Sequence, residues 1–123
     1  MMCKRLISRE TGFNMSEREI KQGEIYWSNQ PHMKGHLQKG SRPFLVVSSL
    51  NNKGYTTILP ISSKIKNISN RFNIEANNRP QQVLLDQPQT APISTLGRYM
   101  GKLKPEEVNE VLVAMFDYFF CFE

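Results

Sequence analysis

Turn-forming residues divide the middle of this chain into short runs, and this division limits the possible folds more than any other feature. Asparagine, glycine and proline concentrate in residues 29–40, 51–54, 77–80 and 88–92. The runs between them are rich in β-branched and aromatic residues, as half-buried strands are. The pattern predicts short strands over residues 24–28, 44–49, 55–61, 72–75 and 82–86.

The C-terminal segment follows a different period. Pro105 suits the first position of a helix, and Glu106 and Glu107 suit the positive end of its dipole. Apolar residues then recur at helical spacing from Val108 to Phe119. Further apolar side chains widen this stripe, so we expect the helix to be buried on more than one side, by the sheet and by a second subunit. The whole pattern predicts a mainly β fold with a C-terminal helix, built as a small, strongly curved sheet or partly closed barrel.

Length and composition fit a single domain. The chain has 123 residues, which is enough for one modest core. Residues 1–21 lack turn-bounded apolar alternation, so we predict a poorly ordered N-terminal extension there and one domain over residues 22–123. Cys3 and Cys121 are too few for a disulfide framework and lack the paired spacing of a zinc site. No apolar run approaches the roughly 20 residues of a membrane span. We therefore expect a cytoplasmic protein with no membrane segment, no metal and no cofactor.

Charge is distributed unevenly along the chain. The formal net charge is +5, and no Asp or Glu occurs between Glu24 and Glu75. The basic residues of that interval are Lys34, Lys39, Arg42, Lys53, Lys64, Lys66 and Arg71. An acid-free basic region predicts a surface that binds a polyanion.

One loop in this basic region combines a proton carrier with a fixed cation. His36 lies between Gly35 and Leu37, and the loop ends at Arg42 and Pro43. An imidazole titrates near neutral pH, and a guanidinium presents a planar fork of donors to a phosphate. These residue types favour proton transfer by His36 and phosphate binding by Arg42. The alternatives are an idle exposed histidine and an arginine that caps the edge of the sheet.

Hydroxyl and carboxylate groups follow two other predicted strands. Ser62 and Ser63 come after one strand, where their hydroxyls can bind phosphate oxygens or cap a turn. No Gly-x-Ser-x-Gly motif surrounds them, which argues against a serine nucleophile. Asp86 ends another strand. Its carboxylate can form a turn, or it can orient Arg42 or His36.

The order of these motifs carries more information than any one of them. They are Gly-Glu-Ile-Tyr-Trp at 23–27, Gly-His-x-Gln-x-Gly-Ser-Arg-Pro at 35–43, Leu-Pro-Ile-Ser-Ser at 59–63, Leu-Leu-Asp-Gln-Pro at 84–88 and Gly-Lys-Leu-Lys-Pro-Glu-Glu at 101–107. This series resembles the MazF/PemK/Kid family, the toxins of type II toxin–antitoxin pairs, and it is most similar to the PemK/Kid branch. The resemblance covers the chain from about residue 23 to the C-terminus.

The resemblance implies a fold, an activity and two partners. The expected fold is a homodimer of small SH3-like barrels, related to CcdB, with a C-terminal helix. The expected activity is that of an mRNA interferase, an endoribonuclease that cuts single-stranded RNA at short sequences without a metal. The 2′-hydroxyl of the RNA would attack the phosphate and leave a 2′,3′-cyclic phosphate. A cognate acidic antitoxin would block the site with a flexible tail.

The resemblance also implies roles for particular residues. Carried over by position, the catalytic residues are His36, Arg42, Asp86 and Ser62. The RNA-binding residues expected beside them are Lys34, Lys39, Ser63, Lys64 and Gln87.

Departures from the family pattern leave two other functions open. Leu37 stands in place of a usual glutamate, and Leu84 and Gln89 stand where relatives carry arginines. These losses favour an inactive remnant that binds RNA or antitoxin. The apolar tail at residues 119–122 instead favours a CcdB-like toxin, which poisons DNA gyrase and does not cut RNA.

Overall fold

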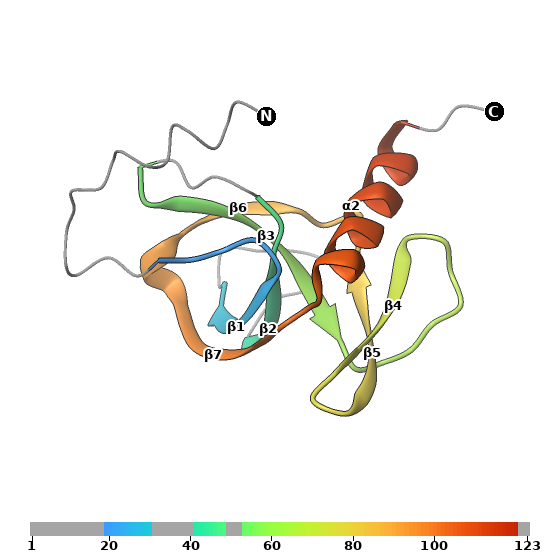
Figure 1. Cartoon of the computed structure of the whole chain (residues 1–123), viewed down its shortest axis with the longest axis horizontal. Helices are drawn as coiled ribbons and strands as arrows, with labels where there is room; N and C mark the ends of the chain where they lie inside the picture. The colour runs from blue at the N-terminus through green and yellow to red at the C-terminus, as the bar shows by residue number, and fades with distance from the viewer. Residues whose placement is uncertain (1–18, 31–40, 49–52, 121–123) are drawn as a thin grey trace.

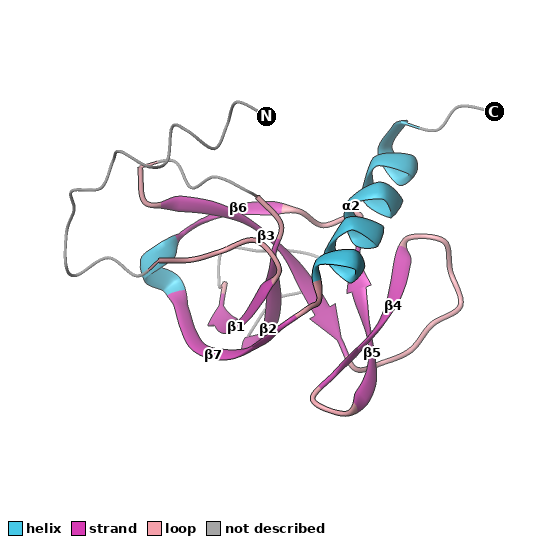
Figure 2. Cartoon of the chain, in the orientation of Figure 1, coloured by secondary structure: helices cyan, strands magenta, loops and turns pink. Residues whose placement is uncertain are grey.

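The computed structural model describes residues 19–30, 41–48 and 53–120. These residues form a seven-stranded sheet, a short 3-10 helix and one long helix (Figures 1 and 2). The strands are β1 (Glu24–Asn29), β2 (Ser41–Val46), β3 (Tyr55–Ser62), β4 (Arg71–Ala76), β5 (Arg79–Leu84), β6 (Gln89–Pro92) and β7 (Leu96–Lys102). The 3-10 helix η1 (Ile93–Thr95) joins β6 to β7, and helix α2 (Pro105–Phe120) follows β7. The predicted mainly β fold with a C-terminal helix is confirmed.

The sheet is antiparallel and curls around its central strand. The strand order is β4-β5-β3-β2-β1-β7, and β6 pairs with β3 outside this path. The first half of β3 pairs with β6, from Tyr55 to Ile58, and its end pairs with β5 at Ile61 and Ser62. Strands β5 and β6 therefore pair with the same edge of β3 and leave it in different directions (Figure 1). This branching produces the curved, partly closed sheet that the sequence predicted.

Local backbone geometry explains the hairpin between β4 and β5. Asn77 and Asn78 have φ values of 56° and 62°, a pair typical of a type I′ turn. Asparagine tolerates this left-handed region better than other non-glycine residues. The predicted turn at residues 77–80 is right in its first half, but β5 already begins at Arg79.

Strand boundaries differ from the sequence prediction at β2 and after β5. Strand β2 begins at Ser41 and not at Phe44, because Arg42 precedes a proline and is biased toward extended backbone. Trp27 and Ser28 of β1 pair with Pro43 and Arg42. Strands β6 and β7 were not predicted, since both contain few β-branched or apolar residues.

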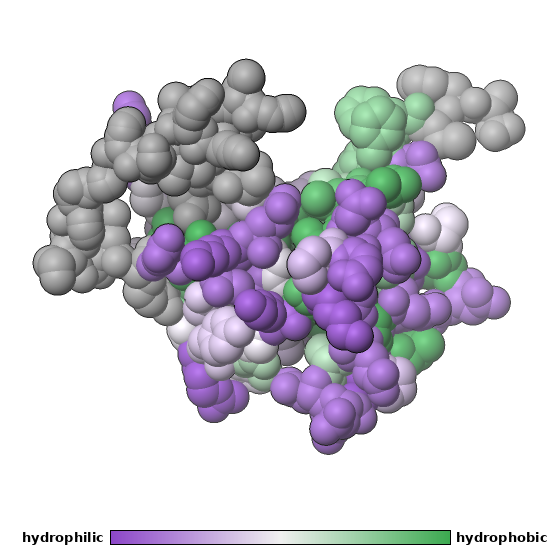
Figure 3. All heavy atoms as spheres, in the orientation of Figure 1, coloured by the Kyte–Doolittle hydropathy of each residue, from purple (hydrophilic) through white to green (hydrophobic). Residues whose placement is uncertain are grey.

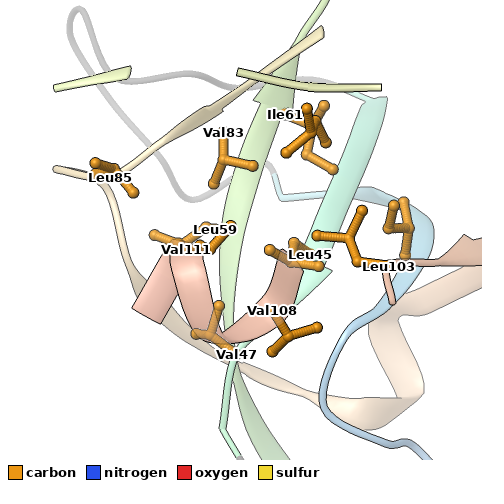
Figure 4. Packing of buried hydrophobic residues seen from close by; sticks show 11 residues of the cluster. Leu45, Val47, Leu59, Ile61, Val83, Leu85, Leu103, Val108 and Val111 are labelled. Carbon is orange, nitrogen blue, oxygen red and sulfur yellow. The ribbon is translucent and has the colours of Figure 1, made fainter. Parts of the chain in front are cut away.

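Two clusters of buried residues fill the two sides of the sheet. We call the larger one the helix-covered cluster, because α2 contributes Val108 and Val111 to it (Figure 4). Its other buried members are Ile25, Leu45, Val47, Leu59, Ile61, Ile74, Val83, Leu85 and Leu103. The second cluster consists of Ile20, Tyr26, Phe44, Val46, Ile58, Ala91 and Leu96. Alternate residues of β1, β2 and β3 enter alternate clusters, as strand geometry requires.

Among the residues that the structure describes, helix α2 is buried on one side only. Its buried residues are Val108 and Val111. Its large exposed apolar residues are Val113, Phe116, Tyr118, Phe119 and Phe120. The outer turns of α2 accordingly stand out as apolar in the space-filling view (Figure 3). The predicted burial of one helix side by the sheet is therefore confirmed, and burial of a further side by a second subunit stays a prediction.

Candidate active site

An open hollow of about 510 Å³ lies on the same side of the sheet as the helix-covered cluster, beyond the end of that cluster. It draws residues from β1, β2, β3, β5, β7 and the turns next to them. They are Trp27, Ser41, Arg42, Pro43, Ile61, Ser63, Asn77, Arg79, Gln81 and Met100. We call this space the first hollow.

The period of the strands explains which residues line the first hollow. Val83 on β5 and Leu85 just past its end belong to the helix-covered cluster, and Gln81 and Arg79 continue the same row into the hollow. Ile61 near the end of β3 is followed two positions later by Ser63, just past that strand. Side chains two positions apart on a strand share a face. The rows that are apolar under α2 thus become hydroxyl, amide and guanidinium groups beyond it.

Arg42 is the side chain of the first hollow that is best placed to bind an anion. Its Nη1 donates a 3.5 Å hydrogen bond to the carbonyl of Ile61, while its Nε is buried without a partner. Burial lowers the pKa of the Arg42 guanidinium below its usual value, because desolvation disfavours the charged form. The group stays protonated all the same. A half-buried cation with an unused donor is suited to binding an anionic ligand.

Ser62 and Ser63 are adjacent but lie in different environments. Ser62 is buried at the end of β3, and its Oγ accepts a 3.0 Å hydrogen bond from the backbone N–H of Lys64. Ser63 is exposed and lines the first hollow. The structure therefore brings Ser63 to the hollow that Arg42 lines, whereas Ser62 holds the turn that presents it.

A buried glutamine fixes the segment that follows this turn. The Gln82 Oε1 accepts a 2.9 Å hydrogen bond from the backbone N–H of Lys66, and its Nε2 donates a 3.0 Å bond to the Lys66 carbonyl. The Arg71 Nη1 donates to both the Lys64 carbonyl and the Gln82 Oε1, each at 3.1 Å. These bonds tie residues 64–66 to β4 and β5, so the turn at Ser63 is held in one place.

Asp86 and Gln87 do not line the first hollow. Asp86 is half-buried beyond the end of β5, and its Oδ1 is buried without a hydrogen-bond partner. No hydrogen bond or ion pair joins Asp86 to Arg42 in the described chain. Gln87 is half-buried, and its backbone N–H donates a 3.4 Å bond to the carbonyl of Leu84.

The remaining predicted site residues are Lys34, His36, Lys39 and Lys64. The first three lie outside the described residues. Lys64 is exposed next to Ser63.

Two polar side chains of the first hollow, Arg79 and Gln81, were not among the predicted site residues. Both alternate with Val83 and Leu85, so a period of two starting from the apolar end of β5 would have found them. Gln81 is buried, and its Nε2 donates a 3.0 Å hydrogen bond to the carbonyl of Ala76. Its Oε1 remains available to a donor on a ligand.

The described residues hold neither a metal-binding cluster nor a membrane-spanning helix. No group of three or more His, Cys, Asp or Glu side chains is placed to hold a metal ion there. None of the helices in that part has the length and apolar character needed to cross a bilayer.

Comparison with solved structures identifies the fold. MazF (Form-I) from Deinococcus radiodurans is 20% identical, with a TM-score of 0.70 over 84% of this chain and 98% of that one. An endoribonuclease in complex with its cognate antitoxin, from a mycobacterial species, is 18% identical, with a TM-score of 0.67 over 82% of this chain and 95% of that one. MazE-MazF (Form-II) from D. radiodurans is 18% identical, with a TM-score of 0.66 over 84% and 97%.

Comparison by sequence identifies the family. No curated protein is similar enough in sequence to count as a match. The profile of one family, described as the PemK-like, MazF-like toxin of type II toxin-antitoxin system, matches residues 21–117. This match spans all of the described strands and most of α2. The chain therefore belongs to the PemK/MazF-like toxin family of type II toxin–antitoxin systems.

Proposed function

We propose that this toxin is a metal-independent endoribonuclease that cuts single-stranded RNA, in the manner of an mRNA interferase. One observation carries the proposal: the half-buried Arg42 guanidinium, with its Nε unpartnered, lies at a hollow that Ser63 also lines. Membership of the toxin family and the fold shared with MazF support it. A cation without a carboxylate partner favours a phosphodiester as the ligand.

The chemistry requires little of the protein, because RNA carries its own nucleophile. His36 takes the proton from the 2′-hydroxyl as the general base, and Asp86 is the alternative base. The 2′-oxygen then bonds to phosphorus, the bond from phosphorus to the 5′-oxygen breaks, and that oxygen is protonated. The products are a 2′,3′-cyclic phosphate and a free 5′-hydroxyl. DNA lacks the 2′-hydroxyl and is not cut.

Charge stabilisation falls to Arg42. It remains protonated at every relevant pH, so it stabilises charge on the phosphate and does not donate a proton. One well-placed donor of this kind contributes roughly 3 kcal/mol. Ser62 and Ser63 bind the non-bridging oxygens in the proposed complex. Ser63 already lines the hollow, whereas Ser62 must turn its O–H away from the Lys64 carbonyl, 3.5 Å from its Oγ, to take part. Lys34, Lys39, Lys64 and Gln87 are proposed to bind the flanking RNA.

The proposal includes two protein partners and a cytoplasmic location. Two of the similar solved structures are described as complexes, one with a cognate antitoxin and one of MazE with MazF. A cognate acidic antitoxin that folds on binding suits the basic surface of this chain. The exposed apolar residues of α2, such as Phe116 and Phe119, favour burial in a homodimer.

The same apolar helix end supports a second candidate function. Phe119 and Phe120 are exposed near the end of α2. A gyrase poison of the CcdB type would use such a surface to bind its target without cutting RNA. An inactive remnant would bind RNA or antitoxin only.

Incubation of the purified protein with a long single-stranded RNA, with EDTA present, separates these functions. The proposed enzyme gives discrete fragments ending in 2′,3′-cyclic phosphate and leaves single-stranded DNA intact. Gyrase–DNA cleavage complexes without RNA fragments indicate the poison, and RNA binding without fragments indicates the remnant. His36→Ala is expected to lower the cleavage rate about 100-fold or more with the fold unchanged by circular dichroism. Full activity in this variant removes His36 from the mechanism.

A further inference from the structure

A second hollow adjoins the first one. It has a volume of about 440 Å³ and is lined by Asn77, Arg98, Tyr99, Met100 and Gly101. Asn77 and Met100 line both hollows, so the two are parts of one continuous surface. The shared wall consists of the tip of the β4–β5 hairpin and one residue of β7. A ligand longer than one hollow can therefore pass from the first to the second without leaving the protein.

The charge of this continuous surface is of one sign. Arg42 and Arg79 line the first hollow, and Arg98 lines the second. Among the described residues, no Asp or Glu lines either of them. Arg79 and Arg98 are exposed, and neither has an ion-pair or side-chain hydrogen-bond partner in the described chain. Guanidinium groups that the protein leaves unneutralised attract an anion of extended shape, such as a phosphate backbone.

Exposed aromatic rings accompany these cations. Trp27 in the first hollow is 38% exposed, and Tyr99 in the second is 50% exposed. The ring of Tyr99 packs edge-on against the buried ring of Tyr26, with centroids 5.6 Å apart and planes at 66°. This contact orients Tyr99 toward the side of the sheet that holds the second cluster, so the path from Trp27 to Tyr99 runs around the β7 edge, past Met100. Alternating aromatic and basic side chains are how single-stranded nucleic acid is bound, with bases on the rings and phosphates on the cations.

The two positions where relatives carry arginines do not provide such cations here. Leu84 is 1% exposed, and Gln89 donates a 3.2 Å hydrogen bond from its Nε2 to the Oε1 of Gln30. Arg79 and Arg98 are free of such constraints, and they flank the wall shared by the two hollows. Arg79 supplies positive charge from the other end of the strand that carries Leu84, and Arg98 supplies it from β7.

We infer that the two hollows form one binding site for adjacent nucleotides of single-stranded RNA, in which Arg79 and Arg98 bind phosphates and Trp27 and Tyr99 stack on bases. This inference rests on the proposed function, since it extends the RNA path away from the phosphate held by Arg42. It assigns Arg79, Arg98 and Tyr99 as binding residues, not catalytic ones. The amide of Gln81, on the wall of the first hollow, is placed to hydrogen-bond the base that stacks on Trp27.

The test measures RNA affinity against salt concentration with the full-length protein. The probe is a fluorescent single-stranded oligonucleotide of mixed sequence with 2′-O-methyl groups, which block attack on the phosphate. Arg79→Ala and Arg98→Ala are each expected to weaken binding about 10-fold and to reduce the slope of log K against log salt by about 0.7. Tyr99→Ala is expected to weaken binding roughly 5- to 100-fold with the slope unchanged, and Tyr99→Phe restores affinity because it keeps the ring.

A matched variant controls for net charge. Lys104→Ala removes one exposed positive charge outside both hollows, so its slope is expected to stay at the wild-type value. If Arg79→Ala and Arg98→Ala behave like Lys104→Ala, the inference is overturned, whatever the cleavage assay shows. If instead the slopes fall as expected but unmodified RNA is never cut, the proposed nuclease function fails and the binding site stands.

Discussion

One face of the sheet has two ends, one covered by α2 and one open at the first hollow. The same strands run through both ends, but their side chains differ in chemistry. Under α2 the face consists of residues such as Ile25 and Val83, which are buried against Val108 and Val111. Beyond the helix the same strands present the aromatic, polar and charged groups of the first hollow. The change takes only two positions along a strand, as from Val83 to Gln81. The helix therefore decides which part of the face becomes core and which remains open to a ligand.

The unpartnered buried polar atoms at the two ends differ in kind. Native proteins leave few buried polar atoms without a partner. In the described chain the Arg42 Nε and the Arg71 Nε are donors of this kind, and both residues donate to backbone carbonyls of the segment 61–64 at the open end. The Asp86 Oδ1, an acceptor of this kind, lies next to Leu85 at the helix-covered end. Such atoms cost stability unless a ligand uses them. Burial under α2 stabilises the fold. The unpartnered donors at the open end lower that stability and are available to bind a ligand.

The largest effect on stability is expected at Gly23, just before β1, where an added side chain would meet α2. Gly23 has a φ of +93°, and a Cβ placed on it would lie 2.7 Å from the Val108 Cγ2. Gly23→Ala therefore combines backbone strain of about 1–3 kcal/mol with overpacking of similar size. We expect it to lower the free energy of unfolding by about 4 kcal/mol, measured by urea denaturation.

Gly101 provides the matched control at the open end. Its φ is +131°, but a Cβ there would have no atom within 4 Å. Gly101→Ala therefore carries the strain without the clash, and we expect a loss of only about 1–3 kcal/mol. Equal losses of unfolding free energy at both positions would show that the contact with α2 adds no cost at Gly23 beyond backbone strain. The two ends would then not differ in how tightly they are packed.

The fold was predictable from the sequence where turn-forming residues and helix-start residues mark the ends of the elements. Asparagine pairs, glycines and prolines marked the turns, and Pro105 marked the start of α2. Strands β6 and β7 escaped prediction because they are held by pairing with β3 and β1, not by their own composition. Long-range pairing of this kind overrides local propensity and leaves no periodic signal.

The site was predictable only in part. Arg42 and Ser63 were found from their motifs, and they do line one hollow. Ser62 and Asp86 stand in the same motifs but lie outside that hollow, since a motif gives order along the chain and not direction of the side chain. A period of two places Arg79 in the row of Gln81 and Val83, but no local pattern encodes that the β4–β5 hairpin meets β7 at the hollows.

The second largest effect is expected on catalysis at the open end. Arg42→Ala should lower the RNA cleavage rate about 100- to 1000-fold, because one donor to the transition-state charge is lost. The free energy of unfolding should change by less than about 0.5 kcal/mol, since the guanidinium makes a single long hydrogen bond within the described part of the chain. Both quantities are measured on the same preparation, by fragment analysis and by urea denaturation.

Arg71→Ala is the control for Arg42, because it removes the same charge from the same region. Arg71 donates to the Lys64 carbonyl and to Gln82, so its loss should cost about 1–3 kcal/mol of stability. Its effect on the cleavage rate should be smaller than that of Arg42→Ala. The reverse order of the two rates would place the reacting phosphate at Arg71 and not in the first hollow.

The smallest effects are expected at the two adjacent serines. They compare a side chain that holds the turn, Ser62, with one that lines the first hollow, Ser63. Ser62→Ala removes the acceptor for the Lys64 N–H, so we expect a loss of about 1 kcal/mol in stability. Ser63→Ala should leave stability unchanged and lower the cleavage rate less than about 10-fold, because only one neutral donor to the phosphate is lost. If Ser62→Ala instead slows cleavage more than Ser63→Ala and leaves stability intact, the turn must open when RNA binds. The open end would then differ from the helix-covered end in its ability to rearrange as well as in its chemistry.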